Sequence, residues 1–122
     1  MKPLVERSIG TIIVLEPQGR LVLGENPSDS VLRDRIATLL QQGRRQFAID
    51  LVHVSHVDTS GLTTLVGAYI GVRKQNGRIV LLNAATRVRE LLAVTRLNTL
   101  FEVFDTDDQM RDSFDATRPS QP

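Results

Sequence analysis

The stretch that decides the fold is 54-VSHVDTSGL-62, which joins an apolar, strand-like segment to an amphipathic one. Asp58 and Thr59 both suit the cap of a helix, because a short side-chain oxygen accepts a hydrogen bond from a free backbone N–H of the first turn. Gly61 allows a second backbone segment to approach closely. The stretch therefore predicts a strand that leads into a helix, with the hydroxyl groups of Thr59 and Ser60 at the exposed helix N-terminus.

A hydroxyl group in this place has a functional and a purely structural interpretation. The positive end of a helix favours negative charge, so the fold would tolerate a phosphate on Thr59 or Ser60, and that phosphate would change the surface that a partner meets. The same Asp-Thr-Ser sequence is also a common capping sequence with no further role. The residue pattern alone leaves both interpretations open.

Strands and helices alternate on both sides of this stretch. Before it, the sequence predicts a hairpin of residues 4–7 and 10–17, an extended segment at 18–24, a helix that starts at Asn26-Pro27-Ser28-Asp29 and stops at Gly43, and a strand at 47–51. The helix that follows the stretch ends at Asn76-Gly77. After it come a strand at 78–83, a helix that starts near Thr86, a strand at 101–104 and a helix from 107 to about 114. Helices between strands imply crossover connections, so the pattern predicts a mixed sheet with parallel pairs.

Composition excludes several classes of protein. The 122 residues predict one domain, over residues 1–114, and residues 115–122 lack large apolar side chains and predict a flexible C-terminal tail. Fifteen Lys and Arg against 14 Asp and Glu give a net charge of +1, which argues against a nucleic-acid-binding protein. The absence of cysteine excludes disulfides, thiol catalysis and cysteine-ligated metals.

The sequence also lacks the features that would direct it to a membrane. No run approaches the ~20 apolar residues of a membrane span, and the first ten residues do not resemble a secretory signal. We therefore expect a cytoplasmic protein without membrane insertion, a monomer or weak dimer that folds without a metal.

The sequence contains no recognisable catalytic or metal-binding motif. His53 and His56 have a spacing that could hold a metal on a helix, but they fall in a strand and its connector, which predicts a solvated pair. Asp58 stands where the nucleophile motif G-x-S-x-G around Ser60 would need a glycine. There is no glycine-rich phosphate loop, so we predict no catalytic residues, no cofactor and no enzyme activity.

Small residues form a strip on the helix that follows the central stretch. Gly67, Ala68 and Gly71 fit either close helix–sheet packing or a flat contact surface. Helix glycines usually have a packing reason, so packing is the favoured interpretation.

Three segments together resemble the STAS family, the anti-sigma factor antagonists and their relatives. The central signature is Asp58-Thr59-Ser60-Gly61-Leu62 after the strand and connector 49–54; residues 69–81 resemble the family's helix, glycine turn and strand, and residues 88–104 its third helix and last strand. The match covers roughly residues 10–114. The resemblance implies a single α/β domain with a mixed four- or five-stranded sheet and helices mainly on one face.

The resemblance also implies a function. In the family, the hydroxyl residue directly after the Asp is the phosphoacceptor, which is Thr59 here, with Ser60 as the second candidate. Asp58, Gly61 and Leu62 would order the loop and contact the partner. An unphosphorylated antagonist sequesters an anti-sigma factor that is itself a serine/threonine kinase; phosphorylation ends the binding and a serine/threonine phosphatase restores it.

One segment departs from the family pattern. Many antagonists carry Gly-Glu-Leu-Asp after the second strand, whereas residues 19–25 place Arg20 at the acidic position and lack the Asp. The resemblance thus implies the class of partner but not its identity. The alternative function is an adaptor or scaffold, as in subunits of lipid-trafficking ABC transporters or stressosome components.

Overall fold

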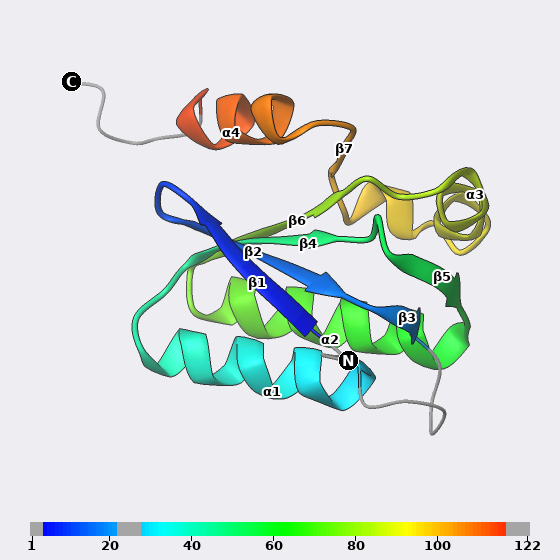
Figure 1. The fold of residues 1–122 in the computed structure, drawn as a ribbon, viewed down its shortest axis with the longest axis horizontal. Helices are drawn as coiled ribbons and strands as arrows, with labels where there is room; N and C mark the ends of the chain where they lie inside the picture. Colours follow the sequence, from blue (N-terminus) through cyan, green and yellow to red (C-terminus); the bar gives the residue numbers. More distant parts are fainter. Residues whose placement is uncertain (1–3, 22–27, 117–122) are drawn as a thin grey trace.

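The computed structural model describes residues 4–21 and 28–116, which build a five-stranded mixed sheet. In spatial order its strands are β1 (Leu4–Ile9), β2 (Ile12–Pro17), β4 (Gln46–Asp50), β6 (Arg78–Leu82) and β7 (Val103–Phe104) (Figure 1). The hairpin of β1 and β2 is antiparallel, and every later pair in this sheet is parallel. The predicted mixed sheet is confirmed, with five strands.

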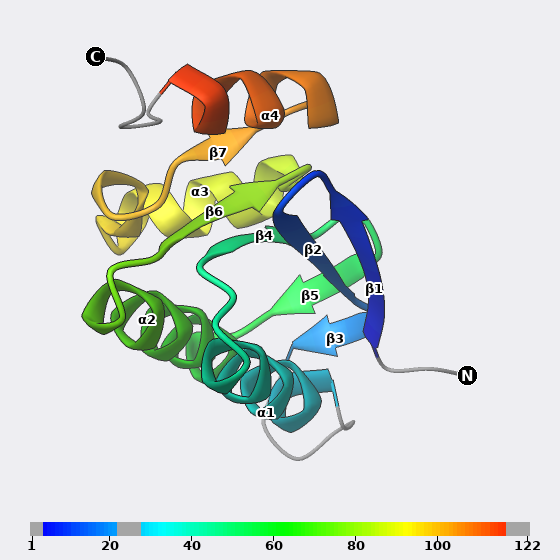
Figure 2. The same ribbon diagram turned by 90° about the vertical axis from the view of Figure 1, so that its left-hand side faces the viewer.

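A second, two-stranded sheet lies beside the first. Its strands, β3 (Gly19–Leu21) and β5 (Val54–Val57), pair in parallel (Figure 2). The predicted strand and connector over 49–54 agree with the end of β4 at Asp50 and the turn after it, but the separate strand β5, which begins at Val54, was not predicted. The buried residues of β5 are Val54 and Val57, three positions apart, so the strand lacks the alternation that identifies strands in a sequence.

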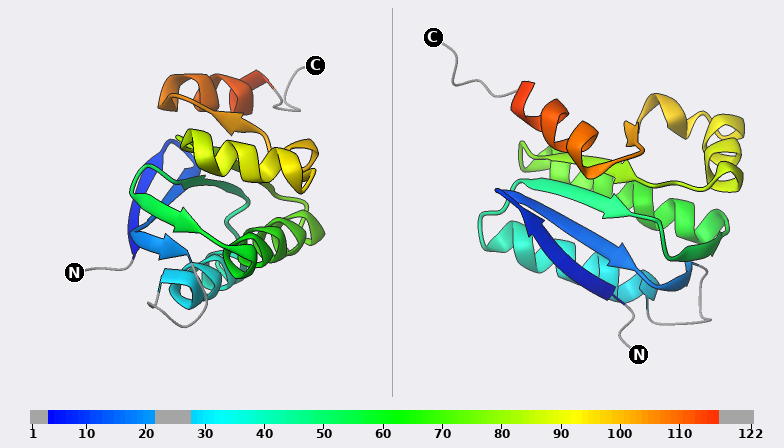
Figure 3. Two further views of the ribbon diagram at one scale, coloured as in Figure 1. Left: turned by 90° about the vertical axis from the view of Figure 1, so that its right-hand side faces the viewer. Right: turned by 45° about the horizontal axis from the view of Figure 1, so that its top comes forward.

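Helices cover both faces of the five-stranded sheet unequally. Helices α1 (Ser28–Gln41) and α2 (Thr59–Lys74) lie on one face, and α4 (Asp107–Ala116) lies on the other (Figures 1 and 3). Helix α3 (Thr86–Val94) contributes Val88 and Leu92 to the same large hydrophobic cluster as α1 and α2. Met110 and Phe114 of α4 pack in a smaller cluster against β2, β4 and β6. The expectation of helices mainly on one face is confirmed.

Most predicted boundaries agree with the structure. Helix α1 ends just before Gly43, whose φ of +90° suits a helix stop, and α3 begins at Thr86. The last strand is shorter than predicted, and α4 continues to Ala116, two residues beyond the predicted end of the domain at residue 114. Asn26, Pro27 and residues 117–122 lie outside the described residues, so the flexible tail stays a prediction.

The small-residue strip on α2 has a different origin from the one favoured above. A Cβ atom added at Gly67 or Gly71 would meet no atom within 4 Å, whereas Ala68 is buried. The two glycines border a shallow groove between α1 and α2, together with Ile36 and Leu40. Close packing therefore explains Ala68 but not the glycines.

A cluster of charged side chains connects the hairpin to α4. The guanidinium group of Arg7 lies 2.5 Å from Glu16, 3.1 Å from the buried carboxylate of Asp50 and 3.0 Å from Asp107 at the start of α4. These hydrogen bonds, the one to Asp107 above all, raise the pKa of Arg7. Asp50 also accepts hydrogen bonds from the backbone N–H of Val52 and the side-chain amide of Asn83, so its burial is fully compensated.

None of the helices in the described ranges is long and apolar enough to cross a membrane.

Candidate functional site

The candidate site is the junction between β5 and α2, where Asp58 caps the helix. Asp58 has an extended backbone, and its Oδ1 accepts a hydrogen bond from the N–H of Gly61 at 2.9 Å. Its carbonyl oxygen accepts the first helical hydrogen bond, from the N–H of Leu62 at 3.0 Å. Of the two capping candidates, the structure therefore selects Asp58, and this leaves Thr59 as the first residue of the helix.

Thr59 presents its side chain to solvent. The residue is exposed, and among the described residues the structure records no hydrogen bond of its hydroxyl group. The first turn of α2, all of it described, contains no acidic residue, so the positive end of the helix is offset only by the carboxylate of Asp58. The side chain thus combines access from solvent with a favourable potential for an anion.

Ser60 is a poorer candidate on geometric grounds. It lies one position into the helix and is half-buried, unlike its exposed neighbour Thr59. Thr59 is thus the more accessible of the two candidate hydroxyl residues.

Gly61 and Leu62 shape the site from inside the protein. A Cβ atom at Gly61 would lie 2.1 Å from the carbonyl oxygen of Leu21, so only glycine lets α2 approach β3 this closely. Leu62 is 5% exposed and belongs to the main hydrophobic cluster. Their expected role in ordering the loop fits this placement. Both residues are buried, and their expected contact with a partner stays a prediction.

Arg20, the residue that departs from the family pattern, lies on β3 next to the site. Arg20 is exposed on β3, and its Cα pairs with that of His56 on β5. The backbone N–H of Asp58 lies 3.4 Å from the carbonyl oxygen of Leu21, which continues the same contact. Residues 19–21 are thus neighbours of the junction although almost 40 positions separate them from it in the sequence.

The two histidines do not form a metal site within the described residues. His53 lies in the turn before β5, with 57% of its side chain exposed and its Nε2 4.0 Å from Glu16. His56 lies within β5 and is half-buried, so the two histidines do fall in a strand and its connector, but only His53 is fully exposed to solvent. In the ranges 4–21 and 28–116, no group of three or more His, Cys, Asp or Glu could hold a metal ion.

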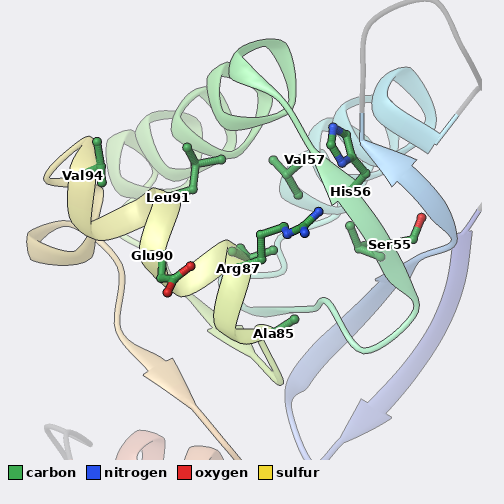
Figure 4. Close-up of a pocket in the computed structure, with 10 residues that line it drawn as sticks. Ser55, His56, Val57, Ala85, Arg87, Glu90, Leu91 and Val94 are labelled. Atoms are coloured by element: carbon green, nitrogen blue, oxygen red, sulfur yellow. The ribbon is translucent and has the colours of Figure 1, made fainter.

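A cleft lies beside the junction, at a place where no binding site was predicted. It lies between β5 and α3 and has a volume of about 400 Å³ (Figure 4). The lining residues are Val54, Ser55, His56, Val57, Ala85, Arg87, Val88, Glu90, Leu91 and Val94. The one signal available was the apolar face of the helix that starts at Thr86, which is wider than burial in the core requires: Val94 is 81% exposed.

Comparisons with known proteins agree with this architecture. The anti-sigma-B factor antagonist of Bacillus subtilis (strain 168) is 34% identical over 76 residues, which is 62% of this chain and 69% of that protein. A crystal structure of a Thermotoga maritima protein superposes with a TM-score of 0.81 at 16% identity, over 90% of this chain and 92% of the other. The phosphorylated form of the Bacillus cell fate determinant SpoIIAA gives a TM-score of 0.71 at 19% identity, over 91% and 98%.

The structural matches have low sequence identity and establish the fold. The family is established independently, because the model of the STAS domain matches residues 4–110, which include every strand of both sheets and the junction at Asp58. The chain belongs to the STAS domain family.

Proposed function

We propose that this protein is an anti-sigma factor antagonist whose binding to an anti-sigma factor is switched off by phosphorylation of Thr59. The observation that carries the proposal is the exposed Thr59 side chain at the first position of α2, directly after the capping Asp58. The similarity to the Bacillus subtilis anti-sigma-B factor antagonist, and the existence of SpoIIAA in a phosphorylated form, support the same assignment.

The physical basis of the switch is the charge of the phosphate. Phosphorylation adds about −1.5 to −2 charges at pH 7. The helix N-terminus tolerates this charge in the free protein. In a complex, the phosphate would lie between the partner and the carboxylate of Asp58, where like charges repel. A loss of only ~1.4 kcal/mol in binding free energy lowers the affinity tenfold.

The proposal assigns the remaining partners by their chemistry. The anti-sigma factor is itself an ATP-dependent serine/threonine kinase that modifies Thr59, and a serine/threonine phosphatase restores the binding form. The protein receives a phosphate and transfers none, so it acts as a binding module in the cytoplasm and not as an enzyme. We expect it to work as a monomer or weak dimer.

Phosphopeptide mapping with the candidate anti-sigma kinase tests the assignment. The kinase should modify the wild-type protein, Ser60→Ala and Thr63→Ala, but not Thr59→Ala. Thr63 is the matched control, because it is another exposed threonine one turn further along α2. Phosphate found on Ser60 would overturn the choice of residue and leave the proposed function intact.

A pull-down tests the consequence for binding. Thr59→Glu should lose the kinase while circular dichroism shows an unchanged fold, whereas Thr59→Ala should keep it. If the unmodified protein binds no anti-sigma kinase at all, the switch is wrong. The adaptor or scaffold function is then favoured, and Arg20 on β3, in place of the acidic residue of many antagonists, is the feature that supports it.

A further inference from the structure

The cleft between β5 and α3 is lined by the outer edge of the main hydrophobic cluster: Val54, Val57 and Val88 belong to that cluster, Leu91 is half-buried beside it, and Val94 is exposed. Val54 and Val57 on β5 face Val88 and Leu91 on α3 across it, and Val94 stands at its rim. The cavity has a volume of about 400 Å³ and is lined mainly by aliphatic side chains. Both its volume and its lining are typical of sites that bind small molecules.

Basic groups gather at one end of this cleft. Arg87 extends from the first turn of α3 toward β5, where His56 lies (Figure 4). Within the described residues the structure records no hydrogen bond or ion pair for either side chain, and none between Arg87 and Glu90, which lies one turn further along α3. Ala85, the residue before α3, makes no side-chain cap, so the positive helix end adds to the same potential.

We propose that this cleft binds a small amphipathic monoanion, a medium-chain carboxylate. Its carboxylate would bind the Arg87 guanidinium, and its chain would lie along Val57 and Leu91 toward Val94. A ligand with one anionic group and an apolar chain would contact both the basic end and the apolar side of the cleft. A polyanion would leave the apolar side chains uncovered. The proposal is independent of the phosphorylation of Thr59.

Titration with octanoate, followed by amide chemical shifts in NMR spectra, tests the site. We expect the shifts to concentrate on β5 and α3. Arg87→Met, which keeps the side-chain volume and removes the charge, should lower the affinity for octanoate about tenfold, equivalent to ~1.4 kcal/mol. Arg33→Met, which changes an exposed arginine on α1, is the matched control and should leave the affinity unchanged.

A comparison with uncharged octan-1-ol separates the contribution of the carboxylate from that of the apolar chain. The wild-type protein should bind octanoate more tightly than octanol, and Arg87→Met should bind both equally. Val94→Glu, at an exposed position that the fold tolerates, should weaken both ligands, whereas acetate should not bind.

Three results would overturn the proposal: equal affinity of the wild type for octanoate and octanol, an equal loss in Arg33→Met, or shifts outside the cleft. Protection of β5 and α3 by a protein partner, in a chain that does not bind octanoate, would also overturn it and would make the cleft part of a protein interface.

Discussion

Helices α2 and α4 begin with the same two residue types in opposite order. In α2, Asp58 caps the helix and Thr59 follows it. In α4, the hydroxyl group of Thr106 accepts a hydrogen bond from the N–H of Gln109, and Asp107 follows it. At each helix the side chain of the first residue of the pair accepts a hydrogen bond from a backbone N–H of the first turn. The side chain of the second residue is available for another partner.

The available residue meets different surroundings at the two helices. Asp107 binds Arg7, which also holds the buried carboxylate of Asp50, so the start of α4 is tied to the sheet. Thr59 faces solvent. Similar local sequences therefore produce a structural tether in one place and an accessible site in the other, and the tertiary partner makes the difference.

The largest expected effect concerns the contact that fixes the start of α2. Gly61→Ala places a methyl group 2.1 Å from the Leu21 carbonyl oxygen, so we expect unfolding in urea to show a loss of about 3 kcal/mol. Gly67→Ala on the same helix meets no atom within 4 Å and should instead leave the protein as stable or more stable by up to ~1 kcal/mol. Equal effects of the two changes would show that α2 does not depend on close approach to β3.

The next effect concerns the tether of α4. Arg7→Ala leaves Asp50, whose side chain is 3% exposed, without its charged partner, and should lower the free energy of unfolding by ~2 kcal/mol. The control is Arg35→Ala, which removes the more exposed ion pair with Glu6 and should cost less than ~1 kcal/mol. If both substitutions cost the same, the cluster at Arg7 contributes no more than a surface ion pair.

The two caps should contribute similar amounts. Asp58→Ala and Thr106→Ala each remove one side-chain acceptor at a helix start, and each should cost about 1 kcal/mol in thermal or urea unfolding. Asp58→Asn should retain most of that stability, since an amide oxygen also accepts the bond. A negligible cost at Asp58 would contradict its role in ordering the junction.

The smallest effect is a pH dependence at the exposed pair. The hydrogen bond from Arg35 lowers the pKa of Glu6 below its ordinary value of 4.5. Its contribution is therefore complete above that value and disappears as the pH falls through the lower folded-state pKa. We expect wild type and Glu6→Gln to differ by a few tenths of a kcal/mol near neutral pH and to converge in acid, as measured by urea unfolding. A difference that persists in strong acid, where Glu6 is fully protonated, would contradict this origin.

The candidate site was partly predictable because its central part is local. Asp58, Thr59 and Gly61 lie within four positions, and capping depends on side chains and N–H groups of the same turn. The burial of Leu62 was less predictable, because it depends on the sheet and helices that surround the residue, which local spacing does not describe; its expected contact with a partner stays a prediction.

The sequence by itself determined the alternation of helices and strands other than β5, the mixed sheet, and the two candidates, Asp58 and Thr59, for the cap of α2. Only the tertiary structure decided the pairing of β3 with β5, the cleft beside the junction, and the cluster in which Arg7 meets Asp107, 100 positions away. Periodicity and capping follow from interactions between near neighbours in the chain, so they can be identified in the sequence. Contacts between distant segments depend on how the whole chain folds, and nothing in the local pattern around Arg7 specifies its partner.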